Sequence, residues 1–216
     1  MWRGIALSAL FLAAGFPLSA RAQGRASNLV DVTTMKHPPL EEIRYATRYN
    51  FTGTQLYPFP AAYVHRELIP LLESVQKELA GKGLGLKIYD GYRPLPVQKK
   101  MWDLIHDERF VSNPAVNQGR HTRGTAVDVT LIDKQGNPLP MPSNFDEFSP
   151  RSAVDYTGGT EEQRRNRDLL QCVMTRYGFL SYPDEWWHFD FHGWKKFEPL
   201  NVGFSHLPRD SSCRRR

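Results

Sequence analysis

The sequence predicts an α+β protein built on a small, mainly antiparallel sheet flanked by helices. Three stretches of helical period and three strand-like stretches are spread along the 216 residues. They lack the regular β-α-β order that produces a parallel sheet. The stretches 23–60 and 138–159 are rich in Pro, Asn and aromatic residues, and we expect them to form ordered loops around a cleft.

The first half of the chain provides two helices and a strand. Pro70 suits the first turn of a helix, and an apolar helical period then runs to Gly81, which can cap the end. Residues 84–90 (LGLKIYD) alternate as in a strand and stop at Gly91. Apolar residues after Pro96 predict a second helix: Val97, Met101, Leu104 and Ile105.

The second half provides two strands and the third helix. Residues 126–133 (AVDVTLID) predict a strand that the turn-like KQGNP closes. Thr160 and Gln163 have the spacing of a capping box, which opens a helix that Gly178 can end. Residues 186–192 (WWHFDFH) again alternate as in a strand.

Residues 1–22 have the pattern of a secretory signal peptide. Arg3 precedes the apolar run IALSALFLAAGF, and the sequence Ala20-Arg21-Ala22 fits an A-x-A cleavage site. The apolar run is shorter than the ~20 residues that a membrane span requires. We therefore expect cleavage near Ala22, no membrane anchor, and a periplasmic or secreted protein.

The mature chain, 23–216, is long enough for a single domain with its own core, followed by a basic, flexible tail from about residue 208. Because no basic patch is interleaved with aromatic residues, we expect no nucleic-acid partner. Cys172 and Cys213 could pair in an exported protein, but Cys213 lies in the polar tail. Paired and unpaired cysteines both stay open, as does the oligomeric state.

Three side chains could hold a catalytic zinc ion, which takes three protein ligands and leaves one position open for water. His121 and Asp128 flank an Arg-Gly-Thr stretch that can turn sharply and bring both to one ion, and His188 could be the third ligand. Asp190 and His192 alternate with His188 on one strand face. Both residues remain alternative candidates for a metal ligand.

Glu185 precedes His188 by three residues, a spacing that puts the two on opposite faces of an ideal strand. Pro183 and Asp184, however, indicate that Glu185 lies in a bend before the strand. From there its carboxylate could act as a general base on the attacking water. It could instead pair with a nearby arginine. The two tryptophans between Glu185 and His188 are expected in the core or the cleft wall.

Four blocks of sequence resemble the zinc D-alanyl-D-alanine dipeptidases. HxxGxAxD (121–128) and EWWH (185–188) are similar to the family's metal signature, and RYAT with NFTG (44–53) and YDGYRP (89–94) resemble two blocks of the dipeptidase branch. The family's clan also includes muramoyl-pentapeptide carboxypeptidases and the hedgehog fold. The likeness runs over about residues 40–192.

The resemblance implies one zinc ion per chain, held by His121, Asp128 and His188 in a cleft on the sheet. It implies Glu185 as base and proton shuttle. It implies Arg93 as the group that stabilises the oxyanion, a role that suits a guanidinium because it stays charged and gives directed donors.

Tyr45 and Asp146 match family positions that receive the free ammonium group of the dipeptide, although Asp146 in SNFDEF could equally cap a loop. The chain departs from the family at Gly119, where the family usually has a cavity-lining serine. We expect a roomier cavity there with one hydrogen bond fewer.

The resemblance thus implies zinc-dependent hydrolysis of the small dipeptide D-Ala-D-Ala, in scavenging or recycling of cell-wall peptide. One alternative is a D,D-carboxypeptidase acting on peptidoglycan stem peptides. Another is a non-catalytic, zinc-containing module that binds the cell wall. Glu185 and Arg93 together favour an enzyme, because binding alone requires neither.

Overall fold

The computed structural model describes residues 28–207. The expected signal peptide with its cleavage site near Ala22, the basic tail and Cys213 lie outside the described residues. Cys172 is exposed, and its pairing with Cys213 stays a prediction. Within residues 28–207, no helix combines the length and the apolar character needed to cross a bilayer.

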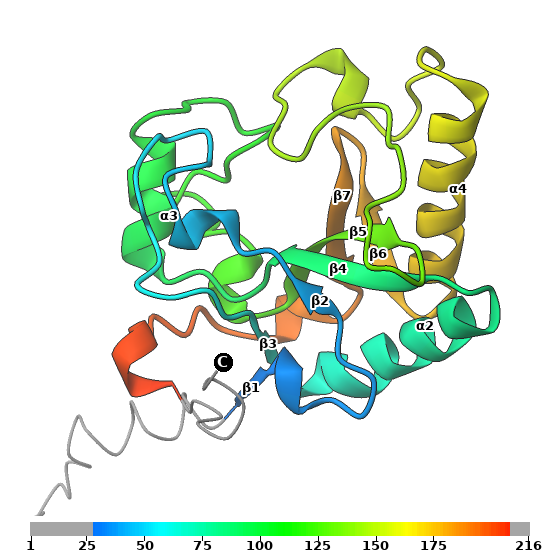
Figure 1. The fold of residues 1–216 in the computed structure, drawn as a ribbon. Helices are drawn as coiled ribbons and strands as arrows, with labels where there is room; N and C mark the ends of the chain where they lie inside the picture. Colours follow the sequence, from blue (N-terminus) through cyan, green and yellow to red (C-terminus); the bar gives the residue numbers. More distant parts are fainter. Residues whose placement is uncertain (1–27, 208–216) are drawn as a thin grey trace, which may run out of the picture.

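A five-stranded sheet organises the molecule, in the order β2-β4-β5-β7-β6 (Figure 1). Its pairs are antiparallel except β2–β4, which is parallel. The three strands predicted from the sequence are confirmed as β4, β5 and β7. The strand bounds are β2 Leu40–Glu41, β4 Gly85–Asp90, β5 Ala126–Ile132, β6 Phe179–Tyr182 and β7 Glu185–Phe191.

Two of the three predicted helices pack on one face of this sheet. Helix α2 (Ile69–Gly81) contacts β4, and α4 (Glu161–Arg176) contacts β5, β6 and β7 (Figure 1). The two helices also touch each other, with an ion pair between Arg176 and Glu78. Helix α4 opens with the predicted capping box, in which Thr160 and Gln163 exchange side chain-to-backbone hydrogen bonds. The α+β class predicted from the sequence is confirmed.

The remaining predicted helix, α3 (Leu95–Trp102), is shorter than the apolar period suggested. Leu104 is 59% exposed beyond its end. Ile105 packs against the core from the following loop. An apolar residue in the right phase can therefore belong to a loop that covers the core, and the sequence alone does not separate that case from one more helical turn.

The opposite face of the sheet is covered by loops. The stretch expected as loop at 23–60 contains β2 and one strand of a separate antiparallel pair, β1 (Leu29–Asp31) with β3 (Tyr63–His65). The stretch 138–159 contains one 3₁₀ turn, Pro150–Ser152, and an isolated bridge of Pro138 to Ile132, and the rest of it is irregular as expected. These loops, together with the segment after α3, form the walls of a cleft.

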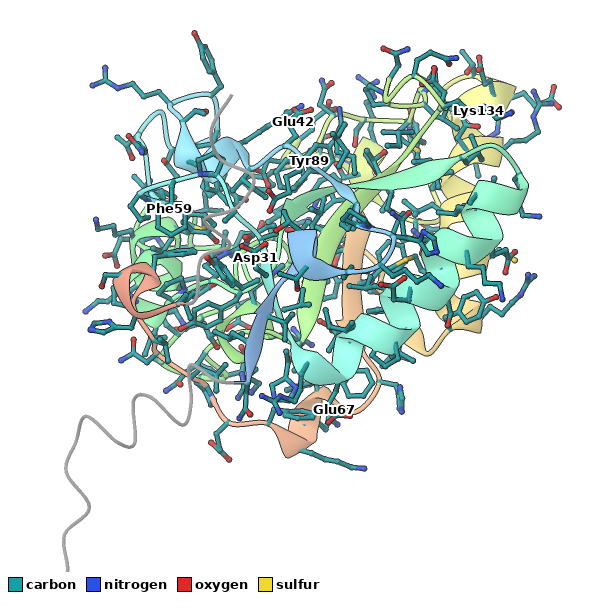
Figure 2. All side chains as sticks on the ribbon, turned by 60° about the horizontal axis from the view of Figure 1, so that its bottom comes forward. Asp31, Glu42, Phe59, Glu67, Tyr89 and Lys134 are labelled. Carbon is teal, nitrogen blue, oxygen red and sulfur yellow. The ribbon has the colours of Figure 1, made fainter. Side chains whose placement is uncertain are left out.

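The sheet has two irregularities of register beside this cleft. On β4, Ile88 pairs with Val129 but Asp90 pairs with Asp128, which leaves Tyr89 as the extra residue. Tyr89 and Glu42 are labelled close together in Figure 2. Asp128 in turn pairs with His188 on β7. Three polar residues of three neighbouring strands therefore stand in one row in the middle of the sheet.

Candidate metal centre and its cleft

His121, Asp128 and His188, called the metal-donor cluster below, each bring one donor atom to the same point. His188 Nδ1 lies 3.0 Å from Asp128 Oδ1 and 3.2 Å from His121 Nε2, and the latter lies 3.4 Å from Asp128 Oδ1. Tetrahedral zinc with bonds of ~2.0–2.1 Å sets its ligand atoms about 3.3 Å apart. The cluster therefore has the dimensions that a zinc ion requires.

The outer nitrogens of both rings have partners that fix their protons. His121 Nδ1 lies 2.7 Å from the carbonyl oxygen of Gly91, which can only accept. His188 Nε2 lies 2.9 Å from Asp190 Oδ1. With a proton on each outer nitrogen, the inner nitrogens turn lone pairs toward each other and toward the Asp128 carboxylate. A cation between them removes this repulsion, so the donor set fits a metal ion.

The charges around the cluster favour positive charge at this point. Burial lowers the pKa of His188, but Asp190 and Asp128 outweigh it and raise that pKa to about 10. Burial raises the pKa of Asp128, but His121 and His188 hold it well below its ordinary value.

The two rival ligands, Asp190 and His192, have other partners in the structure. Asp190 supports His188 from behind, and His192 bonds instead to the carbonyl oxygen of Gly178.

The turn between His121 and Asp128 depends on Gly124. It ends the 3₁₀ turn His121–Arg123 with φ of 69°, in the left-handed region that favours glycine. A Cβ here would lie 2.7 Å from the side chain of Leu29 and 3.0 Å from the backbone nitrogen of His65. The glycine thus lets the chain reverse tightly under β3 and enter β5 with both donors on the cleft side.

Glu185 is the first residue of β7 and not part of a bend before it, as the sequence had indicated. It reaches the His188 side through the second irregularity of register, where Ser181 pairs with Phe189 but Tyr182 pairs with Glu185. Glu185 Oε2 lies 3.8 Å from His188 Nδ1. No arginine forms an ion pair with it within residues 28–207.

The Glu185 carboxylate is a buried acid, with 7% of the residue exposed. Burial raises its pKa well above the ordinary value, the neighbouring Asp128 and Asp146 add to the rise, and His188 and Arg93 oppose it. A raised pKa brings a carboxylate closer to the proton affinity that a general base needs at neutral pH.

Arg93 is buried and held on two sides. Its Nε and Nη2 donate to Asp90 Oδ2 at 3.0 and 2.7 Å, and its Nη1 donates to Gln98 Oε1 at 2.9 Å. A guanidinium has five N–H groups, so two remain for another partner. Nη2 also lies 3.9 Å from Asp128 Oδ2, which places the guanidinium beside the metal-donor cluster.

Tyr45 and Asp146 come together beside Arg93. The Tyr45 hydroxyl donates to the Asp146 carboxylate, with 3.0 and 2.9 Å to its two oxygens. The guanidinium of Arg93 lies 5.4 Å from the centre of the Tyr45 ring. Burial and the charge of Asp128 raise the pKa of Asp146 to about 8. Within residues 28–207 its carboxylate is hydrogen-bonded to Tyr45 and not to a loop backbone, so the capping role considered for Asp146 does not occur there.

Comparison with known sequences shows the family of the chain. The profile of the family described as D-ala-D-ala dipeptidase matches residues 25–205. The chain belongs to this family. A D-alanyl-D-alanine dipeptidase of Escherichia coli is 38% identical over 165 residues, which cover 76% of this chain and 84% of the relative. One of Enterococcus faecalis is 30% identical over 175 residues, covering 72% and 87%.

Solved structures give a weaker likeness. An LD-carboxypeptidase matches 79% of this chain and 70% of its own with a TM-score of 0.46 and 20% identity. A vancomycin resistance D,D-pentapeptidase in complex with Zn(II) matches 62% and 75% with a TM-score of 0.40 and 17% identity. This likeness is too low to transfer any ligand to the present chain.

A cleft lies beside the metal-donor cluster. Its volume is about 30 Å³, room for roughly two water molecules. Three rings from separate loops, called the aromatic bridge below, line it: Phe148 lies 4.9 Å from both Phe51 and Phe110, measured between ring centres.

The departure from the family at Gly119 is partly compensated by neighbouring side chains. A Cβ at Gly119 would lie 3.5 Å from Cβ of Ser112 and 3.6 Å from the amide of Gln98. Both side chains line the cleft. The extra room expected at Gly119 is therefore bounded closely, and the side chain of Ser112 stands beside the position of the missing serine.

Sequence reasoning missed the supporting residues of this site. Asp90 holds Arg93, Gln98 positions it from α3, and Asp190 orients His188. The only sequence signal was a polar residue inside an otherwise apolar stretch, which appears at Asp90 after the strand LGLKIY. For Gln98 the helical pattern carries no such signal, because lysines follow it directly.

Proposed function

We propose that this protein is a zinc metallopeptidase that hydrolyses D-Ala-D-Ala. The observation that carries the proposal is the metal-donor cluster with a buried carboxylate, Glu185, on one side and a buried guanidinium, Arg93, on the other. Two relatives at 30% identity or more, matched over most of their length, bear the name D-alanyl-D-alanine dipeptidase and support this substrate.

His121, Asp128 and His188 would hold one zinc ion per chain. When bound, that ion supplies Lewis acidity to the scissile carbonyl and lowers the pKa of the attacking water. Glu185 takes the proton from the water as it attacks, and passes the proton to the leaving amine. Arg93 directs its free N–H groups at the negative charge that develops on the carbonyl oxygen.

Tyr45 and Asp146 bind the free ammonium group of the dipeptide. The ammonium stabilises the ionised form of Asp146, whose pKa is otherwise raised by burial and by Asp128. A charge-assisted hydrogen bond of this kind fixes the amino end of the substrate. A stem peptide has no free amine at this position, so the same contact favours a dipeptidase over a D,D-carboxypeptidase.

The direct test compares two substrates. Purified protein supplied with zinc should release D-alanine from D-Ala-D-Ala and not from a stem pentapeptide, and a chelator should abolish the release. Release from the pentapeptide alone would favour the carboxypeptidase. Zinc binding with no hydrolysis of either peptide would leave only the non-catalytic wall-binding module.

For the cellular role, we propose scavenging or recycling of cell-wall dipeptide outside the cytoplasm. The support is the signal-peptide pattern of residues 1–22. In a bacterial host, the full-length protein should be cut near Ala22 and leave the cytoplasmic pool of D-Ala-D-Ala unchanged. A version starting at Gln23 and kept in the cytosol should deplete that pool. Finding the native protein uncut in the cytosol would refute the proposed location but not the proposed reaction.

A further inference from the structure

A free dipeptide is a zwitterion, and the groups described so far meet only one of its two charges. Asp146 with Tyr45 meets the ammonium group. The carboxylate at the other end also leaves water when the dipeptide enters the cleft. A desolvated carboxylate requires a cationic or hydrogen-bonding partner. The cleft should therefore contain a second recognition group, and a cation is the stronger partner for a carboxylate.

Three arginines line the cleft, and they differ in what their guanidinium groups already bind. Arg93 is committed to Asp90, to Gln98 and to the reacting carbonyl. Arg109 is 65% exposed in its side chain and donates through Nε and Nη2 to Asp107. Arg120 has no hydrogen-bond partner within residues 28–207, and only its Nε is shielded from solvent. Its Nη1 and Nη2 are thus accessible and free.

Arg120 is nevertheless held in place. Its Nε lies 3.2 Å from Asp190 Oδ2, close enough for an ion pair although not aligned as a hydrogen bond. Its guanidinium carbon lies 4.8 Å from the ring centre of Trp194 and 5.8 Å from that of Tyr182. An arginine fixed through its Nε and the faces of its guanidinium loses little further freedom when its Nη groups bind a ligand.

Arg120 and Asp146 lie on different sides of the metal-donor cluster. Asp146 stands with Tyr45 and Arg93. Arg120 stands with Asp190 and Tyr182, both of which contact His188. The cleft thus has a carboxylate on the Arg93 side and a free guanidinium on the His188 side. This is the charge order of an extended dipeptide with its peptide bond at the cluster.

We propose that Arg120 binds the C-terminal carboxylate of the substrate and so restricts the enzyme to peptides with a free carboxylate. The inference rests on the proposed function and adds the group that recognises the second end. It predicts that dipeptides whose C-terminus is amidated are poor substrates even though their peptide bond and ammonium group are unchanged.

The test measures kcat and KM for D-Ala-D-Ala and for its C-terminal amide, D-Ala-D-alaninamide. The wild type should prefer the free carboxylate by about 10- to 100-fold in kcat/KM, the range for a hydrogen-bonded charge. Arg120→Gln should lose most of this preference, mainly by raising KM for D-Ala-D-Ala. Arg109→Gln, which removes the same charge from the same cleft, should retain the preference.

A purely structural role for Arg120 gives a different result. If Arg120 only holds Asp190 behind His188, Arg120→Gln will lower kcat/KM for both substrates equally, and that outcome overturns the proposal. Zinc content is measured in each variant. Should Arg120→Gln bind less zinc, Arg120→Lys decides, since it keeps a cation and should keep part of the preference. Equal losses for both substrates in that variant also refute the proposal.

Failure of the proposed function can be distinguished from failure of the Arg120 proposal. If the zinc-loaded wild type hydrolyses neither peptide, calorimetric binding of D-Ala-D-Ala and of its amide still tests the carboxylate site. Tighter binding of the free dipeptide, lost in Arg120→Gln but not in Arg109→Gln, supports it. Equal affinity of the wild type for the two peptides refutes it.

Discussion

Replacing Arg93 by lysine keeps the positive charge and removes the planar guanidinium. Arg93 makes three hydrogen bonds to two residues, Asp90 and Gln98, and has two N–H groups left for the cleft. A lysine ammonium can keep one contact to Asp90, but it cannot also reach Gln98 and a carbonyl oxygen in the cleft. The substitution therefore separates the charge at this position from the geometry of its donors.

The structure sets the size of both effects. Gln98 is buried, and loss of its Arg93 partner leaves its amide oxygen unpaired, at about 1–3 kcal/mol of unfolding free energy. For a domain of this size we expect a fall in Tm of about 2–12 °C. Loss of one donor to the developing oxyanion lowers kcat by roughly 10²–10³-fold. Zinc content should not change, because Arg93 makes no hydrogen bond to the metal-donor cluster.

The assay follows D-alanine release from D-Ala-D-Ala, with kcat and KM determined separately. Arg167→Lys is the matched control. Arg167 is also a buried arginine, but it lies on α4, outside the cleft, and donates to Asp168 and to the Tyr156 carbonyl oxygen. It should lose stability and keep kcat. If Arg93→Lys raises KM and leaves kcat intact, Arg93 anchors the bound substrate, and its assignment to the oxyanion is refuted.

Three further predictions concern the neighbouring residues. Glu185→Gln should retain zinc, measured by elemental analysis, and lose about 10²–10⁴-fold in kcat; near-normal turnover would rule out Glu185 as the base. His188→Ala should bind less zinc than the wild type and His192→Ala should bind as much, so the reverse order would contradict the proposed ligands. In chelator-treated protein, Asp146→Asn should raise Tm relative to the wild type at pH 9 but not at pH 4. Folded Asp146, with a pKa of about 8, keeps a proton that the unfolded chain releases near pH 4, and this stability is lost as the pH rises through 8. A difference in Tm that does not change with pH would disprove this account.

The parts of the fold that the sequence predicts are those with a local cause. Strand β5 alternates apolar and polar residues from Val127 to Leu131, and Thr160 and Gln163 form the capping box that begins α4. Strands β2 and β6 were missed because they have two and four residues and sit at the edges of the sheet. Only their pairing with β4 and β7 makes them strands, and that pairing is a non-local property.

The same distinction between local and non-local causes applies to the residues of the site. The motifs around residues 121–128 and 185–188 are local and placed the expected ligands in the sequence. Whether Asp190 binds a metal or supports His188 depends on which ring nitrogen faces β5, and that is set by the pairing of Asp128 with His188. The position of Glu185 likewise depends on a register shift between β6 and β7. Spacing rules for an ideal strand cannot foresee either result.

The aromatic bridge and the metal-donor cluster belong to different parts of the fold. Asp128 and His188 stand on β5 and β7 in the middle of the sheet, and His121 stands on the 3₁₀ turn that leads into β5, whereas the rings of Phe51, Phe110 and Phe148 belong to three loops. These rings line the cleft in which the donors lie, so a substrate that reaches the metal-donor cluster passes beside them. A change in these loops would therefore alter access to the cleft and leave the geometry of the metal-donor cluster unchanged.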